Sequence, residues 1–144
     1  MNTTNWDKRF LELAKLAGSW SKDPSTQVGA VIVDENKRIV SVGYNGFPRG
    51  VEDNDRLLDR QEKYDIIVHA EVNALMFANK SVERCTLYTW PFQPCSRCAG
   101  LIIQSGINRV VSVVQQEERW KKNFMIARQL FNESGITMDL INYE

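Results

Sequence analysis

The pattern that most constrains the fold is an alternation of helical and strand-like segments that fills the chain after residue 68. Three helical patterns are each followed by a short apolar run of the kind that forms a buried strand. These helix and strand pairs span 69–80 and 85–90, 95–106 and 108–114, and 119–135 and 136–141. Gly106 and Gly135 stand where the second and third helices should end. Because strands joined by single helices usually run parallel, this part predicts a helix-covered sheet with parallel neighbours.

The first part of the chain adds a helix and a hairpin. Residues 5–21 carry apolar side chains at helical spacing. The runs 27–33 and 38–46 flank a short polar turn, so they are predicted to pair as antiparallel strands. A long polar connection with a helical turn follows. The predicted fold class is α/β: residues 1–144 form a single domain, a three-layer α/β/α sandwich with a mixed five-stranded sheet.

Charge and hydropathy exclude some functions. The 18 Lys and Arg residues balance 18 Asp and Glu residues, which disfavours nucleic-acid binding, because neutralising phosphates requires a basic surface. No apolar run approaches the length of a membrane span, and the segment MNTTNWDKRF lacks the hydrophobic region of a signal peptide. The expected location is therefore the cytoplasm, with no nucleic-acid or membrane partner.

A candidate metal site lies at two of the predicted helix starts. His69, the one histidine of the chain, begins the first of the three helices, and Cys95 and Cys98 begin the second, directly after Pro94. Nitrogen and sulfur are the donors that zinc prefers, and a catalytic zinc takes three protein ligands. A helix N-terminus also favours the thiolate that binds metal. The predicted cofactor is one catalytic Zn²⁺ per chain, held by these three side chains.

Each of these residues has a second interpretation when it is considered alone. A single histidine is often structural, and a C-x-x-C pair also serves redox and purely structural metal sites. Glu71 alone would be a solvated helix residue. Together, however, H-x-E and P-C-x-x-C resemble the signature of the zinc nucleobase deaminases. In that chemistry zinc activates water for attack on the ring, and Glu71 is predicted to be the general acid and base.

The third cysteine, Cys85, lies in a predicted strand. An odd cysteine count without a secretion signal disfavours a disulfide framework. With no second histidine, ligands for a second zinc of Cys/His type are absent from the sequence. Cys85 is therefore predicted to be a buried strand residue.

Two further segments carry a closer resemblance. SKDPSTQVGAVIV (21–33) and GYNGFPRG (43–50), with HAEVNA and PCSRCA, resemble the deoxycytidylate (dCMP) deaminase family from about Trp6 to Gly135. The resemblance implies a hydrolase that converts dCMP to dUMP, with release of ammonia, and so feeds thymidylate synthesis. The zinc motif is shared by the whole cytidine deaminase superfamily. Free cytosine or cytidine, guanine or tRNA adenosine therefore stay open as alternative substrates.

The resemblance also implies where the nucleotide binds. Asn45 is expected to bind the deoxyribose hydroxyl, although a turn residue after a strand would look the same. The segment before the first strand lies near the substrate phosphate in relatives. There Lys22, Ser25 and Thr26 offer an ammonium and two hydroxyl groups, and Arg49 is a further basic candidate. A merely solvated Lys22 is an equal alternative.

Aromatic residues are expected on the approach to the base. Trp120 aligns with an aromatic residue near the nucleotide in relatives, although core packing is the stronger interpretation for it. The stretch before Cys95 is one residue longer than the common pattern, and Trp90 and Phe92 are predicted to line it. Ala70, next to the histidine, completes the predicted substrate contacts.

Assembly and control follow from the resemblance alone. It implies a homo-oligomer, with a hexamer favoured, and regulation by dCTP and dTTP. A nucleoside triphosphate effector would bring Mg²⁺ as a second cofactor. In some relatives the stretch that matches 77–80 lies at a subunit interface tied to that control.

Overall fold

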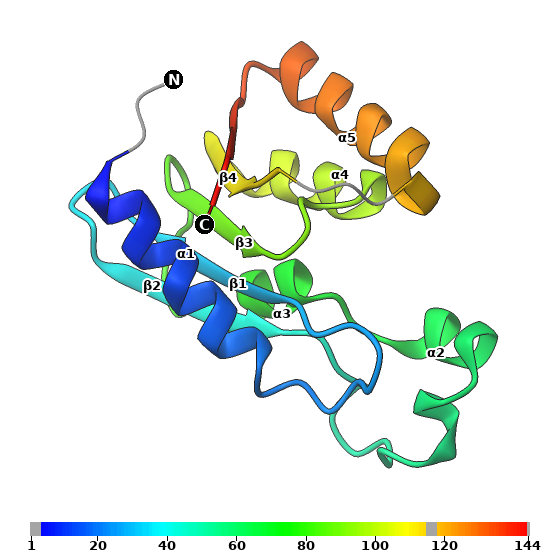
Figure 1. The fold of residues 1–144 in the computed structure, drawn as a ribbon. Coiled ribbons are helices and arrows are strands. Elements are labelled where there is room, and N and C mark those ends of the chain that lie inside the picture. The colour runs from blue at the N-terminus through cyan, green and yellow to red at the C-terminus, as the bar shows by residue number, and fades with distance from the viewer. Residues whose placement is uncertain (1–3, 115–117, 144) are drawn as a thin grey trace.

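The computed structural model describes residues 4–114 and 118–143 (Figure 1). The strands are β1 (Gly29–Val33), β2 (Ile39–Tyr44), β3 (Thr86–Trp90), β4 (Arg109–Val113) and β5 (Thr137–Ile141). The helices are α1 (Asn5–Gly18), α2 (Arg60–Ile66), α3 (Ala70–Phe77), α4 (Ser96–Ser105) and α5 (Lys121–Ser134), with the 3-10 turns η1 (Asp55–Leu57) and η2 (Glu118–Trp120). Every predicted element is therefore present, and the helical turn expected in the long connection becomes η1 and α2.

The five strands form one mixed sheet in the order β2-β1-β3-β4-β5. β3, β4 and β5 pair in parallel, which confirms the prediction for the second part of the chain. The same rule of parallel neighbours, applied to β2 and β3 across the helix predicted at 69–80, is wrong: η1, α2 and α3 lie between the two strands in the sequence, and the strands are not neighbours in the sheet. β1 lies between them and pairs antiparallel with both, because the connection from β2 through α3 passes across β1.

Helices cover both faces of the sheet, which confirms the three-layer prediction. α1 lies on one face, and α3, α4 and α5 lie on the other (Figure 1). Side chains of β1 alternate between two cores: Val31 and Val33 pack toward α1, whereas Ala30 and Ile32 pack toward α3 and α4. Burial on both faces explains why this strand reads as a continuous apolar run.

The start of α3 is fixed to the sheet by backbone contacts. A Cβ atom at Gly43 in β2 would lie 2.5 Å from the Ala74 nitrogen and 2.6 Å from the Ala70 oxygen, so glycine permits this close approach. Just before α3, the Val68 amide donates to the Gly46 oxygen at 2.8 Å, and the Gly46 amide donates back at 3.1 Å. These contacts set the place of the residues that begin α3.

On the opposite face a buried carboxylate ties α1 to the sheet. Asp7 accepts two hydrogen bonds of 2.9 Å from the guanidinium of Arg109 in β4 and one of 2.6 Å from the Tyr88 hydroxyl in β3. Burial raises the pKa of Asp7, but the hydrogen bonds from Arg109, Tyr88 and the Thr4 backbone outweigh it and hold the pKa below its ordinary value. Among the described residues, no helix has both the length and the apolar character required to cross a membrane.

Candidate metal centre and active site

Two helix N-termini bring the three predicted metal ligands together. His69 is the N-cap residue of α3, Cys95 is the N-cap residue of α4, and Cys98 lies in the first turn of α4. The His69 Nδ1 atom lies 3.3 Å from the Cys98 sulfur and 3.6 Å from the Cys95 sulfur. Neither cap side chain caps its own helix; the Ser96 amide donates instead to Asn123 Oδ1 at 2.9 Å. Both cap side chains are therefore directed at the same point.

This cluster fits a zinc ion. In tetrahedral coordination, bond lengths of about 2.0 and 2.3 Å place a nitrogen and a sulfur ligand about 3.5 Å apart, close to both separations here. The hydrogen bond from Cys98 and the neighbouring His69 lower the pKa of Cys95 to about 4, although burial opposes the shift. The shift favours the thiolate of Cys95, which is the form that binds metal. Cys85 is buried in the core, as predicted, apart from the cluster, but it lies directly before β3 and not within the strand.

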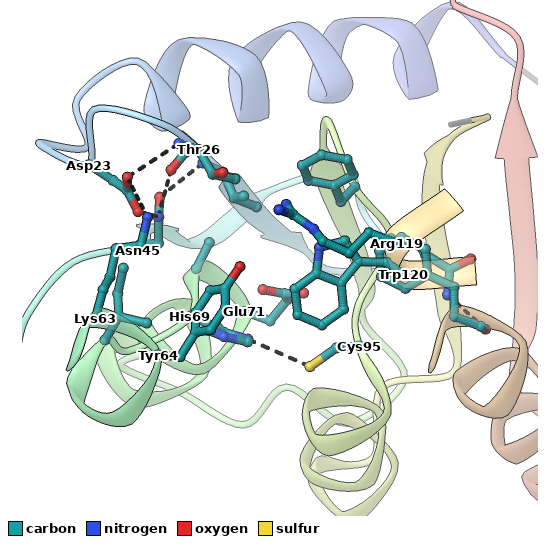
Figure 2. A pocket seen from close by; sticks show the side chains of 16 residues that line it. Asp23, Thr26, Asn45, Lys63, Tyr64, His69, Glu71, Cys95, Arg119 and Trp120 are labelled. Carbon is teal, nitrogen blue, oxygen red and sulfur yellow. Dashed lines mark hydrogen bonds and ion pairs between the residues drawn. The ribbon is translucent and has the colours of Figure 1, made fainter. Parts of the chain in front are cut away.

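Glu71 lies beside the metal ligands at the base of a pocket. It is the second residue of α3, its side chain is buried, and it lines the pocket with His69 and Cys95 (Figure 2). Burial raises the pKa of Glu71 to about 7, although the charge of His69 opposes the shift. A carboxyl group with this pKa both takes and gives a proton near neutral pH.

Four of the predicted substrate residues line this pocket: Asn45, Thr26, Ala70 and Trp120. Asn45 is buried and its side chain fastens the loop before β1, because its Oδ1 accepts from the Val28 amide at 2.9 Å and its Nδ2 donates to the Thr26 oxygen at 2.9 Å. The turn interpretation and the pocket interpretation of Asn45 are therefore compatible.

The other three predicted contacts do not line the pocket. Lys22 is 75% exposed and pairs with Asp53 at 3.2 Å on the surface. Arg49 is exposed, with its guanidinium carbon 5.7 Å from the ring centre of Phe77. Ser25 is exposed, and its hydroxyl accepts a hydrogen bond of 2.7 Å from Lys63. The two basic candidates, Lys22 and Arg49, therefore lie outside the pocket.

An aromatic wall rises on one side of the pocket. The Trp120 ring lies 6.2 Å from Phe124 at an interplanar angle of 20° and meets Tyr64 edge-on at 6.1 Å. Trp120 is only partly buried, so its position is a pocket wall and not the core. Phe92 lines the pocket as predicted, whereas the prediction for Trp90 is wrong, since its ring packs on Tyr143 at 4.7 Å.

Several pocket residues were not among the predicted contacts. Asp23, Lys63, Tyr64, Gln93 and Arg119 all line the pocket. Lys63 and Tyr64 come from α2, within a polar segment for which the sequence predicted a connection with a helical turn but no site residues. The guanidinium of Arg119 extends from η2 toward the space above Glu71 (Figure 2). A buried lysine in a polar segment has no sequence signal of its own.

Comparison with known proteins gives one consistent result. The family described as "Cytidine and deoxycytidylate deaminase zinc-binding region" matches residues 4–114. The "Uncharacterized deaminase in luxG 3'region" of Aliivibrio fischeri is 46% identical over 136 residues, covering 92% of this chain and 91% of the relative. Human deoxycytidylate deaminase is 40% identical over 141 residues, covering 92% of this chain and 77% of the relative.

A solved structure extends the comparison to the fold. The dCMP deaminase from the cyanophage S-TIM5, in complex with dCMP and dUMP, aligns with a TM-score of 0.80 and 25% identity, covering 98% of this chain and 100% of that chain. The sequence match spans both metal-ligand helices, and the same mixed sheet carries them. The chain therefore belongs to the cytidine and deoxycytidylate deaminase family.

Proposed function

We propose that this chain catalyses the hydrolytic deamination of dCMP, in which dCMP and water give dUMP and ammonia. The observation that carries the proposal is the buried Glu71 carboxyl group beside the cluster of His69, Cys95 and Cys98. The deoxycytidylate specificity is supported by the human relative and by the cyanophage enzyme solved with dCMP and dUMP. The hydrolysis forms a C4–O bond and breaks the bond between C4 and the exocyclic nitrogen.

The residues of the site have distinct roles in this proposal. His69, Cys95 and Cys98 would hold a zinc ion, which would supply the Lewis acidity that activates water. Glu71 takes a proton from the attacking water, delivers a proton to ring N3, and then protonates the departing amine, which leaves as ammonia. The carboxyl group is buried beside the metal ligands and lines the pocket, which places it within reach of the attacking water.

The walls of the pocket are proposed to hold the nucleotide. The aromatic wall of Tyr64, Trp120 and Phe124 offers apolar ring faces to a pyrimidine. We assign the phosphate to the side of the pocket lined by Thr26 and Arg119, whose hydroxyl and guanidinium groups suit an anion. Asn45 is proposed to contact the deoxyribose hydroxyl from the loop that it fastens.

The substrate assignment is tested by turnover of purified, zinc-loaded protein. Ammonia release is measured from dCMP, deoxycytidine, cytidine, cytosine, guanine and a tRNA anticodon stem. The highest kcat/KM is expected for dCMP. Equal or higher kcat/KM for the free nucleoside or base would remove the nucleotide assignment while leaving the deaminase chemistry intact.

Three further features stay predictions. They are assembly into a homo-oligomer with a hexamer favoured, regulation by a nucleoside triphosphate with its Mg²⁺, and a cytoplasmic location. Each is independent of the chemistry at Glu71.

A further inference from the structure

The pocket contains a buried lysine that the chemistry at the metal does not use. Lys63, in the middle of α2, has only 5% of its surface exposed. Its ammonium group pairs with Asp23 at 3.1 Å and donates to the Ser25 hydroxyl at 2.7 Å. A lysine is almost never buried unless it is paired, so this arrangement is a defined internal ion pair.

Asp23, the partner of this lysine, organises the loop before β1. Its Oδ1 atom also accepts hydrogen bonds from the Ser25 amide at 2.9 Å, the Ser25 hydroxyl at 3.0 Å and the Thr26 amide at 3.2 Å. Its Oδ2 atom lies 3.5 Å from the Asn45 side-chain nitrogen. One buried carboxylate therefore sets the course of the backbone toward Thr26 and also contacts Asn45, and both of these residues line the pocket.

The ion pair joins two parts of the site that are distant in sequence. Asp23 belongs to the loop before β1, whereas Lys63 lies on the segment that leads into the metal ligand His69 (Figure 2). Breaking such a pair by removing one partner leaves an uncompensated buried charge, which is strongly unfavourable. Without Lys63, the loop would have to expose or protonate Asp23, and Thr26 and Asn45 would move with it.

We propose that Lys63 is a positioning residue for the nucleotide: through Asp23 it fixes Thr26 and Asn45 in the pocket wall. The inference rests on the proposed function, because it assigns these wall residues to the sugar and phosphate. It predicts weaker substrate binding with an intact reaction centre. Among the described residues, no hydrogen bond joins the Lys63–Asp23 pair to His69, Glu71 or the cysteines.

The test compares Lys63→Met with Arg60→Met, an exposed position on the same helix. Lys63→Met is expected to raise KM for dCMP about tenfold with kcat changed less than about threefold, as for a loss of uniform binding. Zinc content should stay at that of the wild type. Arg60→Met should leave KM unchanged. An unchanged KM in Lys63→Met, or a loss of kcat alone, would overturn the proposal.

Two further variants separate positioning from a general loss of stability. In a cycle with Asp23→Asn, the double variant should raise KM by less than the product of the two single effects, because both remove one interaction. A strictly multiplicative effect would argue against the pair. If Lys63→Met aggregates, the double variant replaces it in the test, because it retains neither buried charge. Its KM for dCMP is then compared with that of the wild type.

A readout without turnover keeps the inference distinct from the proposed function. Hydrogen exchange at the Ser25 and Thr26 amides, both bonded to Asp23, should be about tenfold faster in Lys63→Met than in Arg60→Met. Unchanged exchange would refute the role of Lys63 whatever the substrate is. Faster exchange in a protein that does not turn over dCMP would refute the substrate and retain the positioning role.

Discussion

The Nδ1 atom of His69 lies 3.3 Å from the sulfur of Cys98, although 29 residues separate them. They meet because His69 is the N-cap residue of α3, Cys98 lies in the first turn of α4, and the two helices pack against each other on one face of the sheet. A zinc ion held by this cluster would link the two helices.

Removing one thiolate is expected to abolish metal binding. Cys98→Ala should reduce the zinc content to less than about 0.1 per chain and remove activity, because two protein ligands do not form a catalytic zinc site. Cys85→Ala is the matched control, since Cys85 is equally buried but lies outside the cluster. Metal analysis of both purified proteins measures their zinc content. Zinc retained in Cys98→Ala would contradict the assigned ligands.

Glu71→Gln is expected to separate binding of zinc from catalysis. The amide keeps the shape of the side chain but cannot transfer protons, so kcat should fall by about 10²–10⁴-fold. The zinc content should remain about one per chain, because Glu71 is not among the clustered ligands. Steady-state rates and metal analysis of the same preparation check both points. Full activity would exclude the proton-transfer role.

The aromatic wall is expected to contribute to substrate affinity. Trp120→Ala should raise KM for dCMP about tenfold or more, since base stacking on an aromatic side chain contributes about 1–3 kcal/mol. Trp6→Ala removes a partly exposed tryptophan from α1, which stacks on Phe10, and should leave KM unchanged. Equal KM values in the two variants would mean that the wall does not contact the nucleotide.

Acid should weaken the fold through Asp7. Its folded-state pKa is lowered, so its contribution to the free energy of unfolding is complete above the ordinary value of 3.8 and is lost as the pH falls below that value. Asp7→Asn should therefore cost about 1–3 kcal/mol at pH 7 and progressively less below that value. Urea unfolding at pH 7 and at lower pH measures the difference. A constant difference at all pH values would show that Asp7 does not contribute through its charge.

The exposed apolar end of α3 is expected to lie in a subunit contact. Met76 and Phe77 are 75% and 58% exposed, which is unfavourable in water for side chains of this size. Light scattering at micromolar concentration should give a hexamer, and Phe77→Glu should shift the protein to smaller species. A wild-type monomer at that concentration would contradict the predicted assembly.

The sequence predicted the elements well because periodicity and helix-ending glycines are local signals. It did not predict the position of β1 between β2 and β3, since the order of strands depends on how a connection crosses the sheet. The cluster of candidate metal ligands was predictable because each ligand stands at a helix start that the sequence marks.

The side of the pocket proposed for the phosphate could not be predicted as well from the sequence. Lys22 has suitable chemistry, but the neighbouring Asp23 points inward and leaves Lys22 in solvent. The lysine that reaches the pocket, Lys63, is 40 residues away from its partner. Spacing within a motif does not report a pairing over that distance.

Gly43 carries no functional group and does not line the pocket, yet the backbone of α3 rests directly against it. Any side chain there would push the helix outward, and His69 and Glu71 would move with its first turn. A substitution in the middle of a strand would then inactivate the enzyme while every reacting group remained in the sequence. The positions intolerant of change thus extend one layer behind the pocket, to a residue that never meets the substrate.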